Sequence, residues 1–166
     1  MAKTSYAIAL GSNRRHGHHG NPTAVVRAAV DALNASGIKV ERLSRIIATP
    51  ALGPAGRGFA NAAAIVTSKL DPPALLADLK KIERDFGRRG GRRWGPRVLD
   101  LDILLWSEGP WESADLLIPH TEMRERGFVM DPLAEVAPDW RDPITGLTVR
   151  QLQARLHRRE PAEARG

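Results

Sequence analysis

The sequence VLDLDILLW occupies residues 98–106 and alternates apolar and acidic residues near its centre. It is apolar except for Asp100 and Asp102, which stand two positions apart. Side chains alternate between the two faces of a strand, so residues two apart project from the same face. We therefore expect a strand over 98–106 with both carboxylates on one face and Leu101 and Ile103 on the other.

This pair of acids favours a metal site. Two carboxylates this close repel one another unless a cation lies between them. Their oxygen atoms suit Mg²⁺, which keeps several water ligands and takes others from phosphate groups. An exposed polar face on an edge strand is the alternative interpretation. Because Asp is unfavourable in strands, the sequence favours a magnesium site at Asp100 and Asp102.

A basic, glycine-rich loop precedes this strand. Within ten positions it contains Arg88, Arg89, Arg92, Arg93 and Arg97. Mobile arginines beside metal-binding carboxylates are suited to phosphoryl transfer, because both stabilise charge on the phosphates. A solvated or nucleic-acid-binding loop is the alternative. The sequence has neither a Walker-type glycine loop nor a kinase catalytic loop, so it predicts phosphoryl chemistry on another scaffold.

Apolar periodicity in the rest of the chain predicts strands that alternate with helices. Strands are expected over 6–10, 38–47, 61–70 and 98–106, with a turn at 11–13. Helices are expected from Pro22 to Ser36 and from Asp71 to Gly87, and two short ones after caps at Asp131 and Thr148. This order predicts an α+β fold, a ferredoxin-like antiparallel or mixed sheet with helices packed on it in three αβα layers.

Length and composition indicate one ordinary globular domain. The chain has 166 residues, of which 42% are hydrophobic and 27% charged, so a disordered or collagen-like chain is excluded. We expect a single domain over 1–166, with a mobile tail from about residue 157. The absence of cysteine excludes disulfides and thiolate metal sites. Apolar stretches are too short for a secretory signal or a membrane span, so we expect a cytoplasmic protein without a membrane partner.

The charge of the chain indicates an anionic partner. The net charge is +6, and 20 of the 25 basic residues are arginine, which binds phosphate and carboxylate in a bidentate manner. Nucleic acid and a small polyphosphate would both fit. Because five arginines lie in one loop and aromatic residues make up only 5% of the chain, the small ligand is favoured over nucleic acid.

Several short motifs follow one another in an order that is similar to a known family. They are GSN at 11–13, TPALGP at 49–54, FANA at 59–62, RWGPRVLDLD at 93–102, PH at 119–120, RGFV at 126–129 and PL at 132–133. Together they resemble 6-hydroxymethyl-7,8-dihydropterin pyrophosphokinase over about residues 5–140. The segment RWGPRVLDLD is the most specific of these motifs.

The resemblance implies an activity and its catalytic groups. It implies transfer of an intact pyrophosphoryl group from ATP to the pterin hydroxymethyl group, with release of AMP, in folate biosynthesis. It also implies two Mg²⁺ ions held by Asp100 and Asp102, with Arg88 and Arg97 as further catalytic residues. A monomer whose partners are these small molecules, and not nucleic acid, follows from the same resemblance.

The resemblance further implies two sets of binding residues. The pterin set combines aromatic rings with polar groups at the ring edge: Thr49, Pro50, Leu52, Phe59, Asn61, Trp94 and Phe128. The ATP set consists of Glu83, Arg93, Arg97, Ile103, His120 and Arg126. Core packing is the alternative for Phe59 and Phe128, and a structural role is the alternative for His120.

The chain departs from the family at several positions. A basic, histidine-rich insert occupies about residues 14–20, and a solvated loop is favoured over a metal site there. Lys80, Asp115 and Thr121 stand where the family tends to have glutamine, arginine and an aromatic residue. A repurposed or non-catalytic member that binds a pterin or nucleotide is therefore the second hypothesis, and a small nucleic-acid-binding domain is the third.

Overall fold

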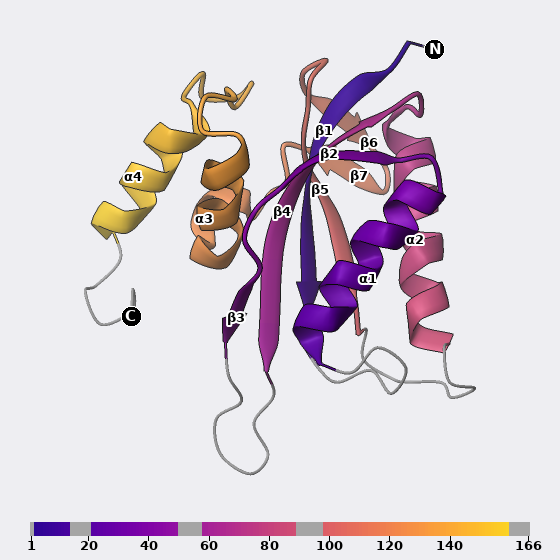
Figure 1. Ribbon diagram of the computed structural model, residues 1–166. Helices are drawn as coiled ribbons and strands as arrows, with labels where there is room; N and C mark the ends of the chain where they lie inside the picture. The colour runs from indigo at the N-terminus through magenta and orange to yellow at the C-terminus, as the bar shows by residue number, and fades with distance from the viewer. Residues whose placement is uncertain (1, 14–20, 50–57, 89–97, 160–166) are drawn as a thin grey trace.

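The computed structural model describes residues 2–13, 21–49, 58–88 and 98–159, and an antiparallel sheet forms its centre (Figure 1). The strands of this sheet are β1 (Thr4–Ser12), β2 (Lys39–Leu43), β3 (Ile47–Thr49), β4 (Phe59–Ser68) and β5 (Asp100–Trp106). Their order is β2-β4-β1-β5, and β3 also pairs with β4. Every neighbouring pair is antiparallel, which confirms the ferredoxin-like expectation.

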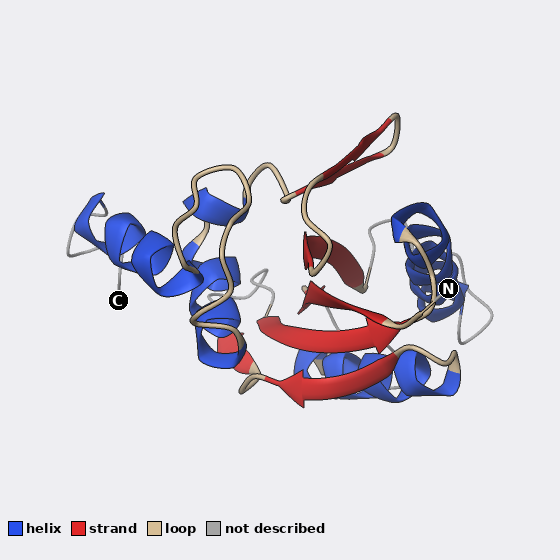
Figure 2. Ribbon diagram, turned by 90° about the horizontal axis from the view of Figure 1, so that it is seen from above, coloured by secondary structure: helices blue, strands red, loops and turns tan. Residues whose placement is uncertain are grey.

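Helices cover both faces of the sheet. The helices are α1 (Pro22–Ala35), α2 (Pro72–Arg88), α3 (Gly127–Val136), α4 (Val149–Arg159) and the short 3₁₀ helix η1 (Met123–Glu125). Helices α1 and α2 pack on one face, and α3 and α4 belong to the other (Figure 2). The three-layer αβα arrangement is therefore confirmed.

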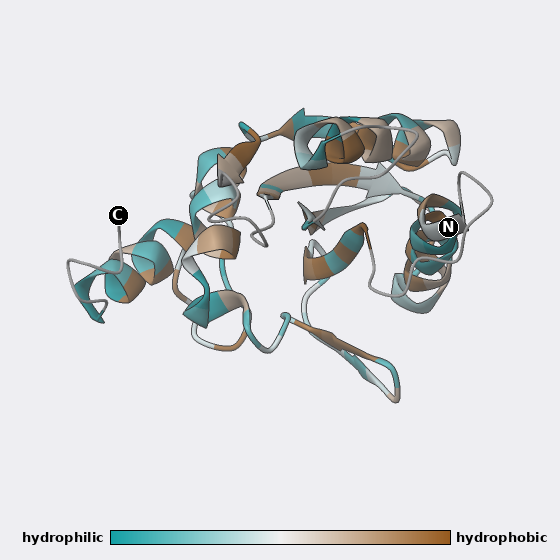
Figure 3. Cartoon of the chain, turned by 90° about the horizontal axis from the view of Figure 1, so that it is seen from below, coloured by the Kyte–Doolittle hydropathy of each residue, from teal (hydrophilic) through white to brown (hydrophobic). Residues whose placement is uncertain are grey.

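Each face of the sheet has its own hydrophobic core. Tyr6 and Ile8 of β1 belong to the core under α1 and α2, whereas Ala7 between them belongs to the core under α3 and α4. This alternation follows from strand geometry. Figure 3 shows hydrophobic and hydrophilic residues side by side on the helices, as one apolar face and one solvated face require.

Three predicted helix starts have the expected caps. The side chains of Asn21 and Asp71 accept hydrogen bonds from the main-chain N–H three residues later, at 2.9 and 3.0 Å. At the start of α4, Thr148 Oγ1 accepts from the N–H of Gln151 at 3.2 Å, and Gln151 Oε1 accepts from the N–H of Thr148 at 2.9 Å. This reciprocal pair is a capping box.

The predicted helix start at Asp131 is wrong. Helix α3 begins four residues earlier, at Gly127, and Pro132 lies inside it. Proline removes one helical hydrogen bond, so the sequence rule places it at a first turn. Burial outweighs that loss here, because Met130 and Leu133 are fully buried in the core under α3 and α4.

Other element boundaries also differ from the sequence-based expectation. The turn expected at 11–13 is wrong, because β1 continues to Ser12 and pairs there with β4. The strand expected over 38–47 divides into β2 and β3. The sequence did not predict a second sheet, the hairpin of β6 (Trp111–Ser113) and β7 (Leu116–Ile118). Helix α4 continues to Arg159, so it includes the first residues of the predicted tail.

None of the helices in the described ranges has the length and apolar character that a membrane crossing requires.

Candidate active site

Strand β5 presents both acids to one cavity, as the alternation predicts. Asp100 and Asp102 line a cavity of about 100 Å³, while Leu101 between them is fully buried in the core under α1 and α2. About half of the Asp102 side chain is exposed. The strand therefore separates a solvated acidic face from an apolar face.

Glu83 of α2 fixes the main chain between the two acids. Its Oε2 accepts a hydrogen bond from the N–H of Leu101 at 2.7 Å, and its Oε1 lies 3.4 Å from Lys80 Nζ. Burial raises the pKa of Glu83, and the Leu101 and Lys80 contacts only partly oppose that shift. No local pattern in the sequence predicts this contact. It makes Glu83 a support for β5, while the predicted contact of Glu83 with ATP stays a prediction.

Asn61, Gly11 and Asp100 form a row across three neighbouring strands. Gly11 of β1 is in register with Asn61 of β4 on one side and with Asp100 of β5 on the other. A Cβ atom at Gly11 would lie 3.1 Å from Asn61 Oδ1, which is closer than ordinary packing allows. Glycine therefore leaves space between an amide and a carboxylate on the floor of the site.

Two exposed aromatic rings line a second, larger cavity beside this floor. Phe59 and Phe128 are 45% and 53% exposed, which argues against core packing for both. They line a cavity of about 440 Å³ together with Asn61, Asp100 and Arg126. All three of these polar residues also line the smaller cavity. The two cavities therefore form one site with an aromatic part and a charged part.

His120 joins the site from the segment after β7. Its main-chain N–H donates to the Leu104 carbonyl of β5 at 3.1 Å. Its Nδ1 accepts a hydrogen bond from the N–H of Glu122 at 3.2 Å, so the hydrogen of the neutral ring lies on Nε2. Nε2 is 4.0 Å from Asp102 Oδ1. The imidazole can therefore donate to an anion placed at the acids.

Arg126 brings a cation to both cavities. Its guanidinium lies 2.7 Å from Glu122 Oε2 and 5.6 Å from the ring centre of Phe128. The second contact is within the range of a cation–π interaction. The charged and aromatic parts of the site therefore meet at Arg126.

A partly buried ion pair holds the segment that contains His120 and Arg126. Arg124 Nε and a terminal nitrogen donate to the two carboxylate oxygens of Asp142 at 2.7 and 3.0 Å. Asp142 is fully buried and also accepts from Ile144 N–H and the Thr145 hydroxyl. Burial acts to raise the pKa of Asp142, but Arg124 and these hydrogen bonds outweigh it, so the pKa is lowered. No motif in the sequence predicts this pair, because its members lie 18 residues apart.

The structure brings together part of the predicted set of site residues. Those that line the two cavities are Phe59, Asn61, Asp100, Asp102, His120, Arg126 and Phe128. The side chain of Ile103 lies in the core, only 2% exposed. Predicted residues outside the described ranges are Pro50, Leu52, Arg93, Trp94 and Arg97, and the structure places only the main chain of Thr49 and Arg88.

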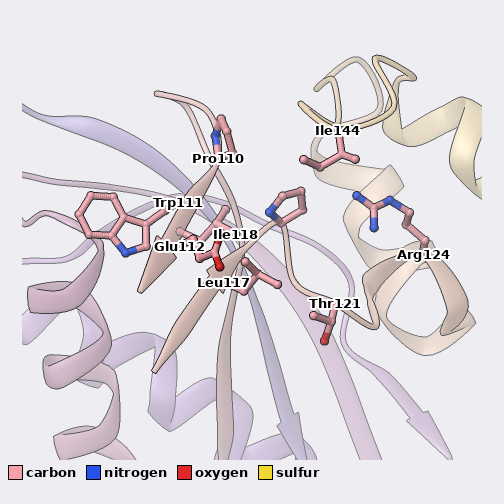
Figure 4. A pocket seen from close by; sticks show the side chains of 9 residues that line it. Pro110, Trp111, Glu112, Leu117, Ile118, Thr121, Arg124 and Ile144 are labelled. Carbon is pink, nitrogen blue, oxygen red and sulfur yellow. The ribbon is translucent and has the colours of Figure 1, made fainter. Parts of the chain in front are cut away.

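Two further cavities share no lining residue with this site. One, of about 440 Å³, lies beside the β6–β7 hairpin and is lined mainly by apolar side chains, with Thr121, Arg124 and Glu112 at its polar positions (Figure 4). The other, of about 470 Å³, lies between α2 and that hairpin, where Lys80 and Asp115 both line it. Lys80, Asp115 and Thr121, which differ from the residues usual in the family, therefore all line these two cavities.

Comparison with known proteins agrees with this geometry. The family model described as 7,8-dihydro-6-hydroxymethylpterin-pyrophosphokinase (HPPK) matches residues 7–138. The chain belongs to this family. The HPPK match runs from β1 through α3 and ends before α4.

Two curated relatives of the chain share one name. A 2-amino-4-hydroxy-6-hydroxymethyldihydropteridine pyrophosphokinase of Synechocystis sp. is 45% identical over 117 residues, which are 70% of this chain and 60% of the relative. The protein of that name from Methylorubrum extorquens is 40% identical over 151 residues, which are 90% of this chain and 91% of the relative.

A solved structure shares the HPPK fold. The crystal structure of Plasmodium falciparum HPPK-DHPS A437G with pteroate superposes with a TM-score of 0.72 at 12% identity. The match covers 99% of this chain but only 43% of the solved chain. At this identity the likeness concerns the fold alone, and it supports the three-layer architecture.

Proposed function

We propose that this chain transfers the pyrophosphoryl group of ATP to the hydroxymethyl group of 6-hydroxymethyl-7,8-dihydropterin, in folate synthesis. As an HPPK, it is an ATP-dependent diphosphotransferase. One observation carries the proposal: a cavity with two exposed phenylalanines and an amide adjoins a cavity with two carboxylates, an imidazole and a guanidinium. An aromatic acceptor and a polyphosphate donor would meet at the shared wall, at Asp100 and Arg126.

The aromatic part of the site suits the pterin. A flat heteroaromatic ring is stabilised by stacking on other rings, and an amide can match donors and acceptors on its edge. Phe128 and Phe59 supply exposed ring surface, and Asn61 supplies the amide. We propose that Trp94 completes the stack, and that Thr49, Pro50 and Leu52 contact the ring edge.

The charged part of the site suits Mg²⁺ and the phosphates. Asp100 and Asp102 offer hard oxygen ligands, and Mg²⁺ keeps several of its positions for water and phosphate oxygens. The donors therefore fit Mg²⁺, and we propose that they hold two ions. When bound, Mg²⁺ would neutralise phosphate charge and stabilise the entering and leaving oxygens.

The residues of the chain would orient and neutralise the triphosphate. His120 Nε2–H and the Arg126 guanidinium can donate to its oxygens on the side facing the acids. We propose that Arg88, Arg93 and Arg97 add further cations, and that Glu83 and Ile103 lie on the nucleotide side. The hydroxymethyl oxygen forms a bond to the β-phosphorus and releases its proton. The bond between the β-phosphorus and the oxygen that links it to the α-phosphorus breaks, and AMP leaves with that oxygen.

We further propose that the chain acts as a monomer in the cytoplasm, with ATP and the pterin as its partners. The basic charge then serves the phosphates of ATP. Neither nucleic acid nor a membrane is needed for this function.

Phosphorus NMR of the reaction tests the proposal. ATP, Mg²⁺ and the protein are followed with and without 6-hydroxymethyl-7,8-dihydropterin, so that AMP and ADP are distinguished. We expect AMP and a pterin diphosphate only when the pterin is present. Folded protein that binds the pterin but releases no AMP would instead support the repurposed member, with Lys80 and Asp115 as the first residues to restore.

A further inference from the structure

Glu122 forms an ion pair with Arg126 inside the site itself. Its Oε2 lies 2.7 Å from the Arg126 guanidinium, and the side chains of Glu122 and Arg126 are 49% and 43% exposed. Both residues line the small cavity with Asp100 and Asp102. The Glu122 carboxylate therefore already pairs with Arg126, close to where the phosphates would bind. Among the described residues that line this cavity, Arg126 is the one arginine.

The contact with Glu122 occupies guanidinium N–H groups of Arg126 that a phosphate would need. A guanidinium binds phosphate and carboxylate through the same planar N–H groups. Since half of each side chain is exposed to solvent, the pair is weak enough to separate when a stronger anion arrives.

We infer that Glu122 is a positioning residue that competes with the triphosphate of ATP for Arg126. This inference rests on the proposed function, because it needs Arg126 to bind the phosphates. A triphosphate offers several negative charges and many acceptors, so it displaces Glu122, whereas an anion of low charge competes poorly. Glu122 therefore lowers the affinity of the site for any anion that must bind Arg126, and a polyphosphate has enough affinity to overcome that cost.

The main chain of Glu122 allows this exchange without loss of the site. Its N–H donates to His120 Nδ1 at 3.2 Å, a contact that does not involve the carboxylate. The side chain can leave Arg126 while the main chain keeps the imidazole in place. The two functions of Glu122 are thus separable by substitution of the side chain alone.

The test measures binding of the Mg²⁺ complex of α,β-methylene-ATP by calorimetry, with inorganic phosphate as the anion of low charge. The variants are Glu122→Gln, Arg126→Ala and the double variant, made in the full chain. Glu125→Gln is the matched control, because Glu125 is an exposed glutamate three residues later, at the end of η1, and lines neither cavity. Thermal unfolding of each variant checks that the fold is kept.

We expect Glu122→Gln to tighten binding of the ATP analogue about two- to fivefold, as the loss of one exposed competing carboxylate allows, and to tighten binding of inorganic phosphate by a similar factor. Glu125→Gln should leave both unchanged. In the Arg126→Ala background, Glu122→Gln should no longer tighten binding. A merely structural role for Glu122 would not produce tighter binding.

Three results would overturn the inference. The first is unchanged or weaker binding in Glu122→Gln. The second is a gain that persists without Arg126, which would indicate general repulsion. The third is an Arg126→Ala variant that binds the analogue normally, which would also remove Arg126 from the ATP site. Pterin-dependent release of AMP by the unaltered chain would still separate these failures from failure of the proposed function.

Discussion

The acidic and basic halves of the site are held in place by different means. Asp100 and Asp102 lie on a regular strand, and strand pairing together with one buried leucine fixes their direction. His120 and Arg126 lie on an irregular segment that surrounds η1, and the side-chain contact of Arg124 with Asp142 holds this segment. Strand alternation therefore gives the acids their direction, whereas the placement of His120 and Arg126 depends on a side-chain contact with a later part of the chain.

This difference predicts how each half responds to substitution. A change at an acid removes chemistry and leaves the fold intact, because both side chains face a cavity. A change at a support of the basic half alters the fold first and the chemistry only as a result. Four predictions follow from the contrast.

Asp100→Asn and Asp102→Asn should have the largest effect. An amide lacks the charge that holds Mg²⁺, so we expect pterin-dependent AMP release to fall about 10³-fold, with thermal unfolding nearly unchanged. Asp31→Asn, an exposed acid on α1, is the control and should keep full activity. An active variant would remove the metal assignment, and an unfolded one would show that the acids support the fold.

Asp142→Ala should destabilise the basic half by leaving Arg124 without its partner. We expect the free energy of unfolding to fall by about 3 kcal/mol in urea denaturation at neutral pH. The lowered pKa of Asp142 means that its contribution is complete above the ordinary pKa near 3.8 and is lost as pH falls through the lowered value. The difference between the two proteins should therefore shrink in acid. Asp139→Ala, at an exposed acid nearby, should show no such loss.

Glu83→Gln tests whether burial of the charged Glu83 carboxylate, which supports β5 between the two acids, lowers the free energy of unfolding. Gln retains an oxygen that can accept the Leu101 N–H, but it has no charge to bury. Because the pKa of Glu83 is raised, the natural chain should lose stability relative to the variant as pH rises above about 4.5 through the raised value. Unfolding in urea at several pH values measures this, and a difference independent of pH would contradict it.

Thr148→Ala should have the smallest effect. It removes one half of the capping box of α4, so we expect a loss of about 1 kcal/mol in unfolding free energy, with normal AMP release. Thr148→Ser keeps the oxygen and should restore stability. A loss of activity in the alanine variant would show that the basic half depends on the start of α4 more closely than its contacts suggest.

The sequence predicted the acidic half more completely than the basic half for a physical reason. Alternation in nine residues is enough to place Asp100 and Asp102 on one face. By contrast, Asp142 meets Arg124 only because the chain returns after α3, and no local pattern signals that return. The hairpin β6–β7 was missed for a similar reason, since its strands are three residues each.

The predicted helix starts show the same difference between local patterns and tertiary contacts. Asn21, Asp71 and Thr148 cap helices through local hydrogen bonds, and these starts were correct. The helix start predicted at Asp131 was wrong, because packing of α3 against the sheet determines where that helix begins. The resemblance to the family supplied the remaining site residues, whose roles stay predictions.

The position of Asp142 has a consequence for shortening this protein. The family match ends at residue 138, which suggests a natural place to trim a minimal catalyst. A chain cut there would lose Asp142 and all of α4, and with them part of the core beneath Met123 of η1. The arginine two residues before Arg126 would face an apolar gap in place of a carboxylate. The segment after residue 138 therefore stabilises the part of the molecule that contains His120 and Arg126. A shortened enzyme would have to retain this segment.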